Sequence, residues 1–99
     1  MRYSIAEPIV LSSSGAAYDG RVYFAGMLLG TDGVNDPVIT VYDNNTNSGV
    51  EIVPTATYDA SVLGLNGAMP NFLIDCQNGI YVEITTAGAC EVTVFYRKY

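Results

Sequence analysis

The residues of this chain that could do chemistry are carboxylates, amides and hydroxyls, because none of its 99 residues is histidine. Without histidine the usual general base near neutral pH is missing, and so are the commonest zinc ligand and any Ser-His-Asp site. A pair of carboxylates could still hydrolyse a glycosidic bond, but a chain of this length with 14% charged residues offers little room for the cleft. We therefore expect no enzymatic activity, no catalytic residue and no cofactor.

Two turns are rich in oxygen atoms that a calcium ion could use. Asp32, Asn35 and Asp36 lie in the first turn, and an Asp-Asn-Asn run at 43–45 lies in the next loop. Asp and Asn also cap turns by bonding to their own backbone, and no EF-hand spacing is present. The sequence favours capping, with the first turn as the calcium candidate and a calcium-stabilised adhesion domain as an open alternative.

The elements that would position these residues are short strands. Turn signals such as Asp-Gly and Asn-Gly recur between runs of alternating β-formers, a pattern typical of a sandwich or barrel. The chain therefore predicts an all-β, single-domain antiparallel β-sandwich over residues 1–99, jelly-roll-like, with about seven or eight strands and negligible helix. We expect strands at Ile5–Leu11, Arg21–Leu29, Val38–Asp43, Val50–Tyr58, Met69–Cys76, Gly79–Thr86 and Cys90–Lys98.

The last two predicted strands show the most regular alternation. Short turns at 87–89 and 77–79 join them to each other and to the strand before, so we expect an antiparallel meander that ends in a hairpin. The apolar alternation of this hairpin should supply the core through Ile80, Val82, Ile84, Val92 and Val94.

The N-terminal part of the chain is less regular. The small-residue run Ser12–Ala17 predicts a loop, and residues 1–20 could form an extended arm. Pro8 and Pro54 lie inside predicted strands, and proline cannot donate to a strand ladder, so both indicate edge strands or bulges.

Charge excludes two classes of partner. The net charge is −6 with only four basic residues, so the chain lacks the cationic stripe that binds nucleic acid or an anionic membrane surface. No apolar run reaches the roughly 18 residues of a membrane helix, and the N-terminus lacks the apolar region of a signal peptide. We expect neither a nucleic-acid nor a membrane partner, and synthesis in the cytosol.

The two cysteines are predicted to be reduced. The predicted strand between Cys76 and Cys90 separates them by roughly 20 Å at about 3.3 Å per residue. A disulfide needs Cα atoms within about 7 Å. We expect both thiols to behave as small, buried apolar groups.

Composition suggests an association surface. Apolar residues make up 49% of the chain and charged residues 14%, against roughly 25% charged in ordinary domains, so part of the surface could be covered by another chain. The alternative is that neutral Thr, Ser and Asn residues supply the solubility. The predicted strand at 38–42 is apolar on both faces. In the predicted strand at 79–86, Tyr81 shares its face with Glu83 and Thr85. The interface candidates are Val38, Thr40, Tyr42, Asn44, Asn45 and Tyr81.

Several segments resemble one group of proteins. The run LGTDGVNDPVITVYDN at 29–44, Ser48-Gly49, LGLNG at 63–67 and NGIYVEI at 78–84 are similar to small proteins of tailed-phage and prophage structural gene clusters. In that group a TDG-ND-VTVYDN strand–turn–strand precedes a closing hairpin of the NGLYVEI…CEVTVYYR type. The resemblance covers residues 20–97 and implies a non-enzymatic virion component, such as a head decoration protein, a fibre domain or a tail-associated subunit.

The resemblance leads to a specific functional hypothesis. We expect a capsid decoration or cementing protein that binds the assembled head, made in the bacterial host cytoplasm and located in the virion. It should be a homo-oligomer, by analogy a trimer, whose partner is the major capsid protein or another virion protein. The segment 1–20 or the loop 44–49 should contact the shell. The alternative is a tail- or fibre-associated β-module that binds a carbohydrate or receptor.

Overall fold

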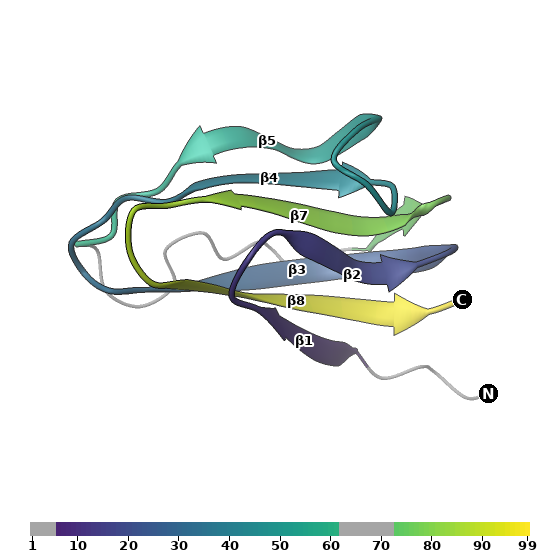
Figure 1. Ribbon diagram of the computed structural model, residues 1–99. Coiled ribbons are helices and arrows are strands. Elements are labelled where there is room, and N and C mark those ends of the chain that lie inside the picture. The colour runs from purple at the N-terminus through teal and green to yellow at the C-terminus, as the bar shows by residue number, and fades with distance from the viewer. Residues whose placement is uncertain (1–5, 62–72) are drawn as a thin grey trace.

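Two antiparallel sheets of four strands face each other in the computed structural model, which describes residues 6–61 and 73–99 (Figure 1). Sheet A has the order β1-β8-β3-β6, and its strands are β1 (Glu7–Leu11), β8 (Cys90–Lys98), β3 (Val22–Thr31) and β6 (Ile74–Cys76). Sheet B has the order β2-β7-β4-β5, and its strands are β2 (Gly15–Asp19), β7 (Gly79–Thr85), β4 (Val38–Asp43) and β5 (Val50–Thr57). Across these described ranges there is no helix, and so none that could cross a membrane.

The strands pair in a nested order. β1 pairs with β8, β2 with β7, β3 with β6 and β4 with β5, all antiparallel. A single long hairpin of eight strands produces this order when it is rolled into two facing sheets, which is the jelly-roll arrangement. The predicted all-β sandwich with jelly-roll character is therefore confirmed.

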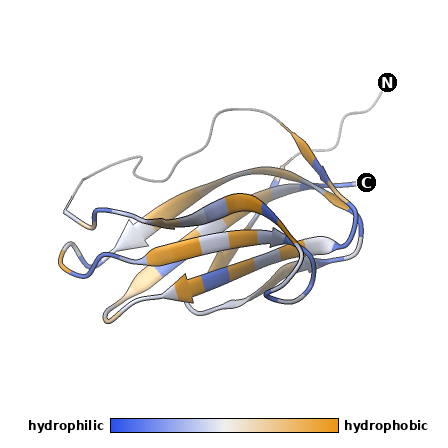
Figure 2. Cartoon of the chain, turned by 90° about the horizontal axis from the view of Figure 1, so that it is seen from above, coloured by the Kyte–Doolittle hydropathy of each residue, from blue (hydrophilic) through white to orange (hydrophobic). Residues whose placement is uncertain are grey.

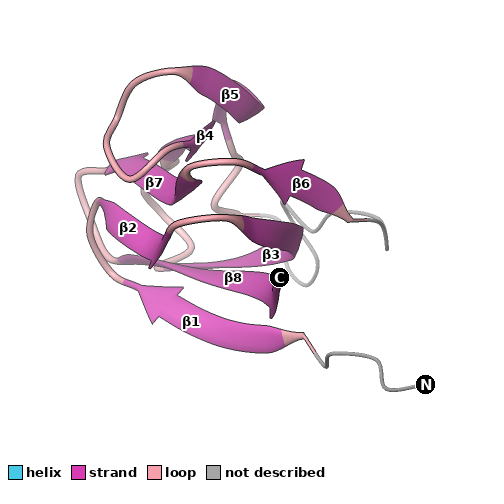
Figure 3. Cartoon of the chain, turned by 90° about the vertical axis from the view of Figure 1, so that its right-hand side faces the viewer, coloured by secondary structure: helices cyan, strands magenta, loops and turns pink. Residues whose placement is uncertain are grey.

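The core lies between the sheets because alternate residues of the central strands point inward. Figure 3 shows the two layers from the side on which the C-terminus lies, and Figure 2 shows apolar and polar residues alternating along the strands. Four of the five predicted core residues are fully buried, and Ile84 packs partly buried against them. The fully buried apolar side chains include Val22, Phe24, Ile39, Val41, Ile80, Val82, Val92 and Val94.

The predicted meander and closing hairpin are wrong. β7 pairs with β2 and β4 in sheet B, whereas β8 pairs with β1 and β3 in sheet A. The turn at 86–89 therefore carries the chain from one sheet to the other. Alternation specifies which face of a strand is buried but not which strand lies beside it, and two apolar faces can be buried across the core as well as within one sheet.

The N-terminal predictions also need correction. Gly15–Asp19 is strand β2 at the edge of sheet B, although Ser12–Ala17 was expected to be a loop. Its small residues fit this edge, and Ala17 points into the core. From Glu7 onward the segment belongs to the two sheets, so it is not an arm. Residues 69–72 of the sixth predicted strand lie outside the described residues.

The two prolines lie where the sequence predicts. Pro8 is in β1 and Pro54 is in β5, and each strand is at the edge of its sheet. The register between β4 and β5 shifts twice, as expected for a bulged edge strand that contains proline.

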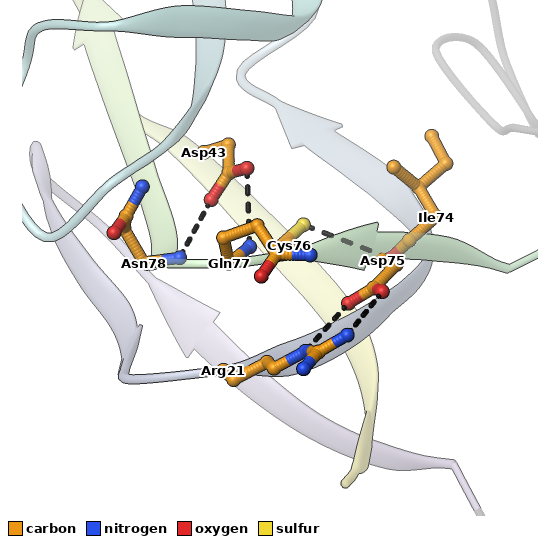
Figure 4. A network of polar contacts seen from close by, with 7 residues as sticks. All are labelled: Arg21, Asp43, Ile74, Asp75, Cys76, Gln77 and Asn78. Atoms are coloured by element: carbon orange, nitrogen blue, oxygen red, sulfur yellow. Dashed lines mark hydrogen bonds and ion pairs between the residues drawn. The ribbon is translucent and has the colours of Figure 1, made fainter.

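A carboxylate at the end of β4 holds the turn in which the chain crosses from sheet A to sheet B. Figure 4 shows Asp43 beside this turn, where its carboxylate accepts hydrogen bonds from the backbone N–H groups of Gln77 (3.1 Å) and Asn78 (2.9 Å). Gly79 follows with φ of 136°, and a side chain there would meet the carbonyl oxygens of Tyr18 and Asn44. The turn therefore requires glycine at this position.

The cysteines are free and buried, as the sequence predicts. Cys76 pairs with Val22 and Cys90 pairs with Thr31, so the two thiols lie at opposite ends of β3. Burial raises the pKa of the Cys76 thiol to about 12, which keeps it neutral and unreactive.

Replacing core valines with alanine tests whether their side chains are buried between the two sheets. Val82→Ala in sheet B and Val92→Ala in sheet A should each lower the free energy of unfolding by roughly 1–3 kcal/mol, because each leaves a cavity between the sheets. Val50→Ala is the matched control, since that side chain is 72% exposed and its loss should change stability by less than about 0.5 kcal/mol. Urea unfolding measures all three, and equal midpoints for the core and control variants would contradict this packing.

Candidate functional site

The outer face of sheet B brings together most of the interface residues predicted from the sequence. On neighbouring strands β4 and β7, Val38 lies opposite Thr85, Thr40 opposite Glu83, and Tyr42 opposite Tyr81. Because Ile39 and Val41 point into the core, these six residues form the solvent side. The sheet B outer face is this set, Val38, Thr40, Tyr42, Tyr81, Glu83 and Thr85, together with Glu51 opposite Tyr42 on β5 and Asn47, which bonds to Glu83.

Thr40 forms the floor of this face and is only 1% exposed. Its hydroxyl lies 2.6 Å from the hydroxyl of Thr55 on β5, so the two side chains share a hydrogen bond. Thr40 therefore supports the surface without presenting its own atoms. Val38, Tyr42 and Tyr81 are half-buried and leave part of each side chain open to solvent.

A carboxylate network surrounds Tyr42. Glu83 accepts a hydrogen bond from the side-chain amide of Asn47 (3.1 Å) and lies close to the Tyr42 hydroxyl. Loss of solvent, followed by the negative charges of Glu83 and Glu51, raises the pKa of Tyr42. The tyrosine stays a neutral hydrogen-bond donor near physiological pH.

The loop between β4 and β5 lies beside the same face. Asn44 accepts a hydrogen bond from the backbone N–H of Asn45 (2.8 Å) and donates to the carbonyl of Ser48 (3.0 Å). Asn45 donates to Asp19 of β2 (3.1 Å), so it bridges the loop to the next strand. Both asparagines are thus engaged in holding the loop, while Asn47 is the loop residue that reaches Glu83.

The calcium candidates serve as turn caps in the structure. Asp32 accepts hydrogen bonds from the backbone N–H groups of Val34 (2.9 Å) and Asn35 (2.8 Å), and from the Asn35 side chain (2.6 Å). These bonds, the backbone bond from Asn35 foremost, lower the pKa of Asp32 to about 2. The N–H of Ala89 also contributes, which ties this turn to the loop between β7 and β8.

Asp36 caps a different backbone segment from the one that Asp32 caps. It accepts a hydrogen bond from the backbone N–H of Ala60 (2.9 Å), beyond the end of β5. Asp32 and Asp36 therefore hold two different backbone segments in place. Within residues 6–61 and 73–99, no group of three or more His, Cys, Asp and Glu side chains is arranged to hold a metal ion.

Sequence reasoning missed part of the sheet B outer face and its charge. Glu83 could be placed beside Tyr81 by alternation, but Asn47 and Glu51 could not, because loop geometry and the bulges between β4 and β5 bring them there. Among the described basic residues, Arg97 and Lys98 lie on β8 of sheet A, and Arg21 lies in the turn before β3, where it pairs with Asp75 of β6. None of them is in a strand of sheet B. The sheet B outer face is consequently acidic.

Comparisons of this chain with protein-family models, with curated proteins and with solved structures find no match.

Acid titration tests the role of Asp32. Its pKa is about 2 in the folded chain against an ordinary value of 3.8, so its contribution to stability is complete above about pH 4 and is lost as the pH falls through 2. Carboxyl NMR should give a midpoint near 2 for Asp32. The difference in urea midpoint between wild type and Asp32→Ala should shrink over the same range. A midpoint near 3.8 would contradict the capping geometry.

Proposed function

We propose that this chain is a non-enzymatic structural protein of a tailed-phage particle, which binds the assembled head as a decoration or cementing subunit. The observation that carries the proposal is the nested eight-stranded jelly roll, an architecture that viral capsid proteins share with lectin domains. The fold supports this role by analogy, since one fold serves many functions. The resemblance of residues 20–97 to phage structural proteins points in the same direction.

The use of polar groups within the chain also supports a structural role. The carboxylates of Asp32, Asp36 and Asp43 each cap backbone N–H groups of turns or loops, and both thiols are buried. These groups stabilise a rigid frame and are not free to act on a substrate. A rigid frame suits a protein that works through many identical surface contacts, because little conformational entropy is lost on binding.

The sheet B outer face is the surface that would meet the particle. It combines two half-buried tyrosines with carboxylates, and tyrosine is enriched at protein interfaces because it offers apolar area and a hydroxyl. The Asn44–Gly49 loop, which was expected to contact the shell, borders this face through Asn47. The partner surface would therefore present cationic or hydrogen-bond-donating groups opposite Glu51 and Glu83. The trimer was expected by analogy alone, and no contact of the described residues supports it.

Co-sedimentation with purified particles tests this function. The wild-type protein should pellet with intact heads of the phage that encodes it and saturate at a fixed ratio, but should not pellet with tails. Tyr81→Ala should raise the dissociation constant by roughly tenfold, the effect of losing one interface tyrosine. Val34→Ala is the control, because that side chain is 81% exposed in the turn between β3 and β4. Failure to pellet with any particle would contradict the proposal.

One observation favours a second function, that of a carbohydrate-binding module on a tail or fibre. Tyr42 and Tyr81 lie directly opposite each other, with the Asn47 amide and the Glu83 carboxylate nearby. Aromatic rings that stack on sugars, flanked by groups that bond to hydroxyls, are the elements such a site needs.

A glycan array separates the two functions. A carbohydrate-binding module should bind a defined set of bacterial surface glycans and lose this binding in Tyr81→Ala, while Val34→Ala should leave it unchanged. A decoration protein should give no signal above background on the same array. Glycan binding that survives Tyr81→Ala would place any sugar site away from this face.

A further inference from the structure

The outer face of sheet A carries apolar side chains that do not pack in the core. The register places Val10 of β1 and Leu28 of β3 on either side of Thr93 of β8, and places Pro8 beside Phe95. Val10 is 55% exposed, and Leu28 and Phe95 are half-buried outside the core cluster. Scattered apolar residues are normal on a surface, but a contiguous group on one face indicates an interaction site.

Opposite charges lie at the two ends of this apolar group. Every second residue of β8 faces outward, so the outward row reads Glu91, Thr93, Phe95 and Arg97. At roughly 3.3 Å per residue, about 20 Å separate the carboxylate end from the guanidinium end. The row is therefore anionic at one end, cationic at the other and apolar between them.

Neither terminal charge of this row is used inside the described part of the chain. The ion pairs there join Arg21 to Asp75 and Lys98 to Glu7, and involve neither Glu91 nor Arg97. The Nε atom of Arg97 is buried, and among the described residues it has no hydrogen-bond partner. A carboxylate from another molecule would give the guanidinium group of Arg97 the ion pair that it lacks among the described residues, and arginine–carboxylate pairs form strong hydrogen bonds.

We propose that the outer face of sheet A binds the same face of a second copy of this chain. The two-fold axis lies in the interface, perpendicular to β8, and passes between Thr93 and Phe95. This axis reverses β8 of the second copy and places Arg97 opposite Glu91 of the partner subunit. The apolar centres of the two faces then meet at the axis, and the Arg97–Glu91 pair forms twice by symmetry.

The charge pattern selects this arrangement over the other two-fold pairings. An axis parallel to β8 would place Arg97 opposite Arg97 of the partner subunit, and like charges repel. Pairing through the sheet B outer face would oppose Glu51 and Glu83 to the same carboxylates, with no cation on that face. Packing sheet A against sheet B would be a head-to-tail contact, which produces rings or open filaments in place of a closed pair.

The area of the face fits a weak pair. The four strands of sheet A hold 5, 9, 10 and 3 residues, so at about 3.3 Å per residue and about 4.8 Å between strands they cover roughly 430 Å² on each copy. A pair would bury roughly 900 Å² in total, which lies below the range of stable protein interfaces and is typical of a transient contact. We therefore expect a dimer that dissociates on dilution.

Sedimentation velocity over a concentration series tests the pairing. The wild type should approach twice its chain mass of 10.6 kDa at high concentration. Arg97→Glu and Glu91→Arg should each raise the dissociation constant at least about tenfold, because each opposes two like charges. The double exchange E91R/R97E should restore the wild-type value. Glu51→Arg is the matched control, since it reverses a charge on β5 and should leave the dimer intact.

Each outcome bears on the proposal. A monomer at all concentrations, a trimer, a filament or a double exchange that stays as weak as the single variants would overturn it. A dimer lost in Glu51→Arg would also overturn it, because the contact would then involve sheet B. If circular dichroism shows that a single charge variant does not fold, Thr93→Arg provides the second test. It places a cation at the centre of the face and should abolish the dimer.

Discussion

The nested antiparallel pairing of the eight strands determines which side chains share a surface, and every other feature of this protein depends on it. Because β8 lies between β1 and β3, its outward residues meet Val10 and Leu28 and form one apolar face. Because β7 lies between β2 and β4, Tyr81 meets Tyr42 on the opposite face of the molecule. A hairpin between β7 and β8 would have placed all of these residues in a single sheet.

The two outer faces differ in chemistry, and this difference suggests a division of roles. Sheet B presents tyrosines and carboxylates without a cation, which suits a basic or hydrogen-bond-donating partner. Sheet A presents an apolar centre flanked by opposite charges, which suits a second copy of itself. A dimer formed through sheet A would leave both sheet B faces open on opposite sides of the pair, so each pair would present two separate binding faces.

Much of the fold could be predicted from the sequence because β-strand periodicity is a local property. The bounds of β4 and β8, the inward rows around Val82 and Val92, and the edge positions of both prolines followed from alternation and from the missing N–H of proline. The partner of each strand is a non-local property that alternation does not encode, so the predicted hairpin was wrong. Strand β2 was missed because its small residues show no alternation of size. On sheet B, Tyr42 and Tyr81 could be placed, whereas Asn47 reaches Glu83 only through the fold of its loop.

The most direct test of this account is a set of interstrand NOEs between backbone protons, measured by NMR on the uniformly labelled protein. The nested pairing predicts NOEs between Ile9 and Val94 and between Val41 and Val82, which are opposite residues of β1–β8 and β4–β7. NOEs between Val82 and Val94, the opposite residues of a closing hairpin, together with the absence of the β1–β8 set, would contradict it. The outer faces assigned to both sheets would then no longer hold.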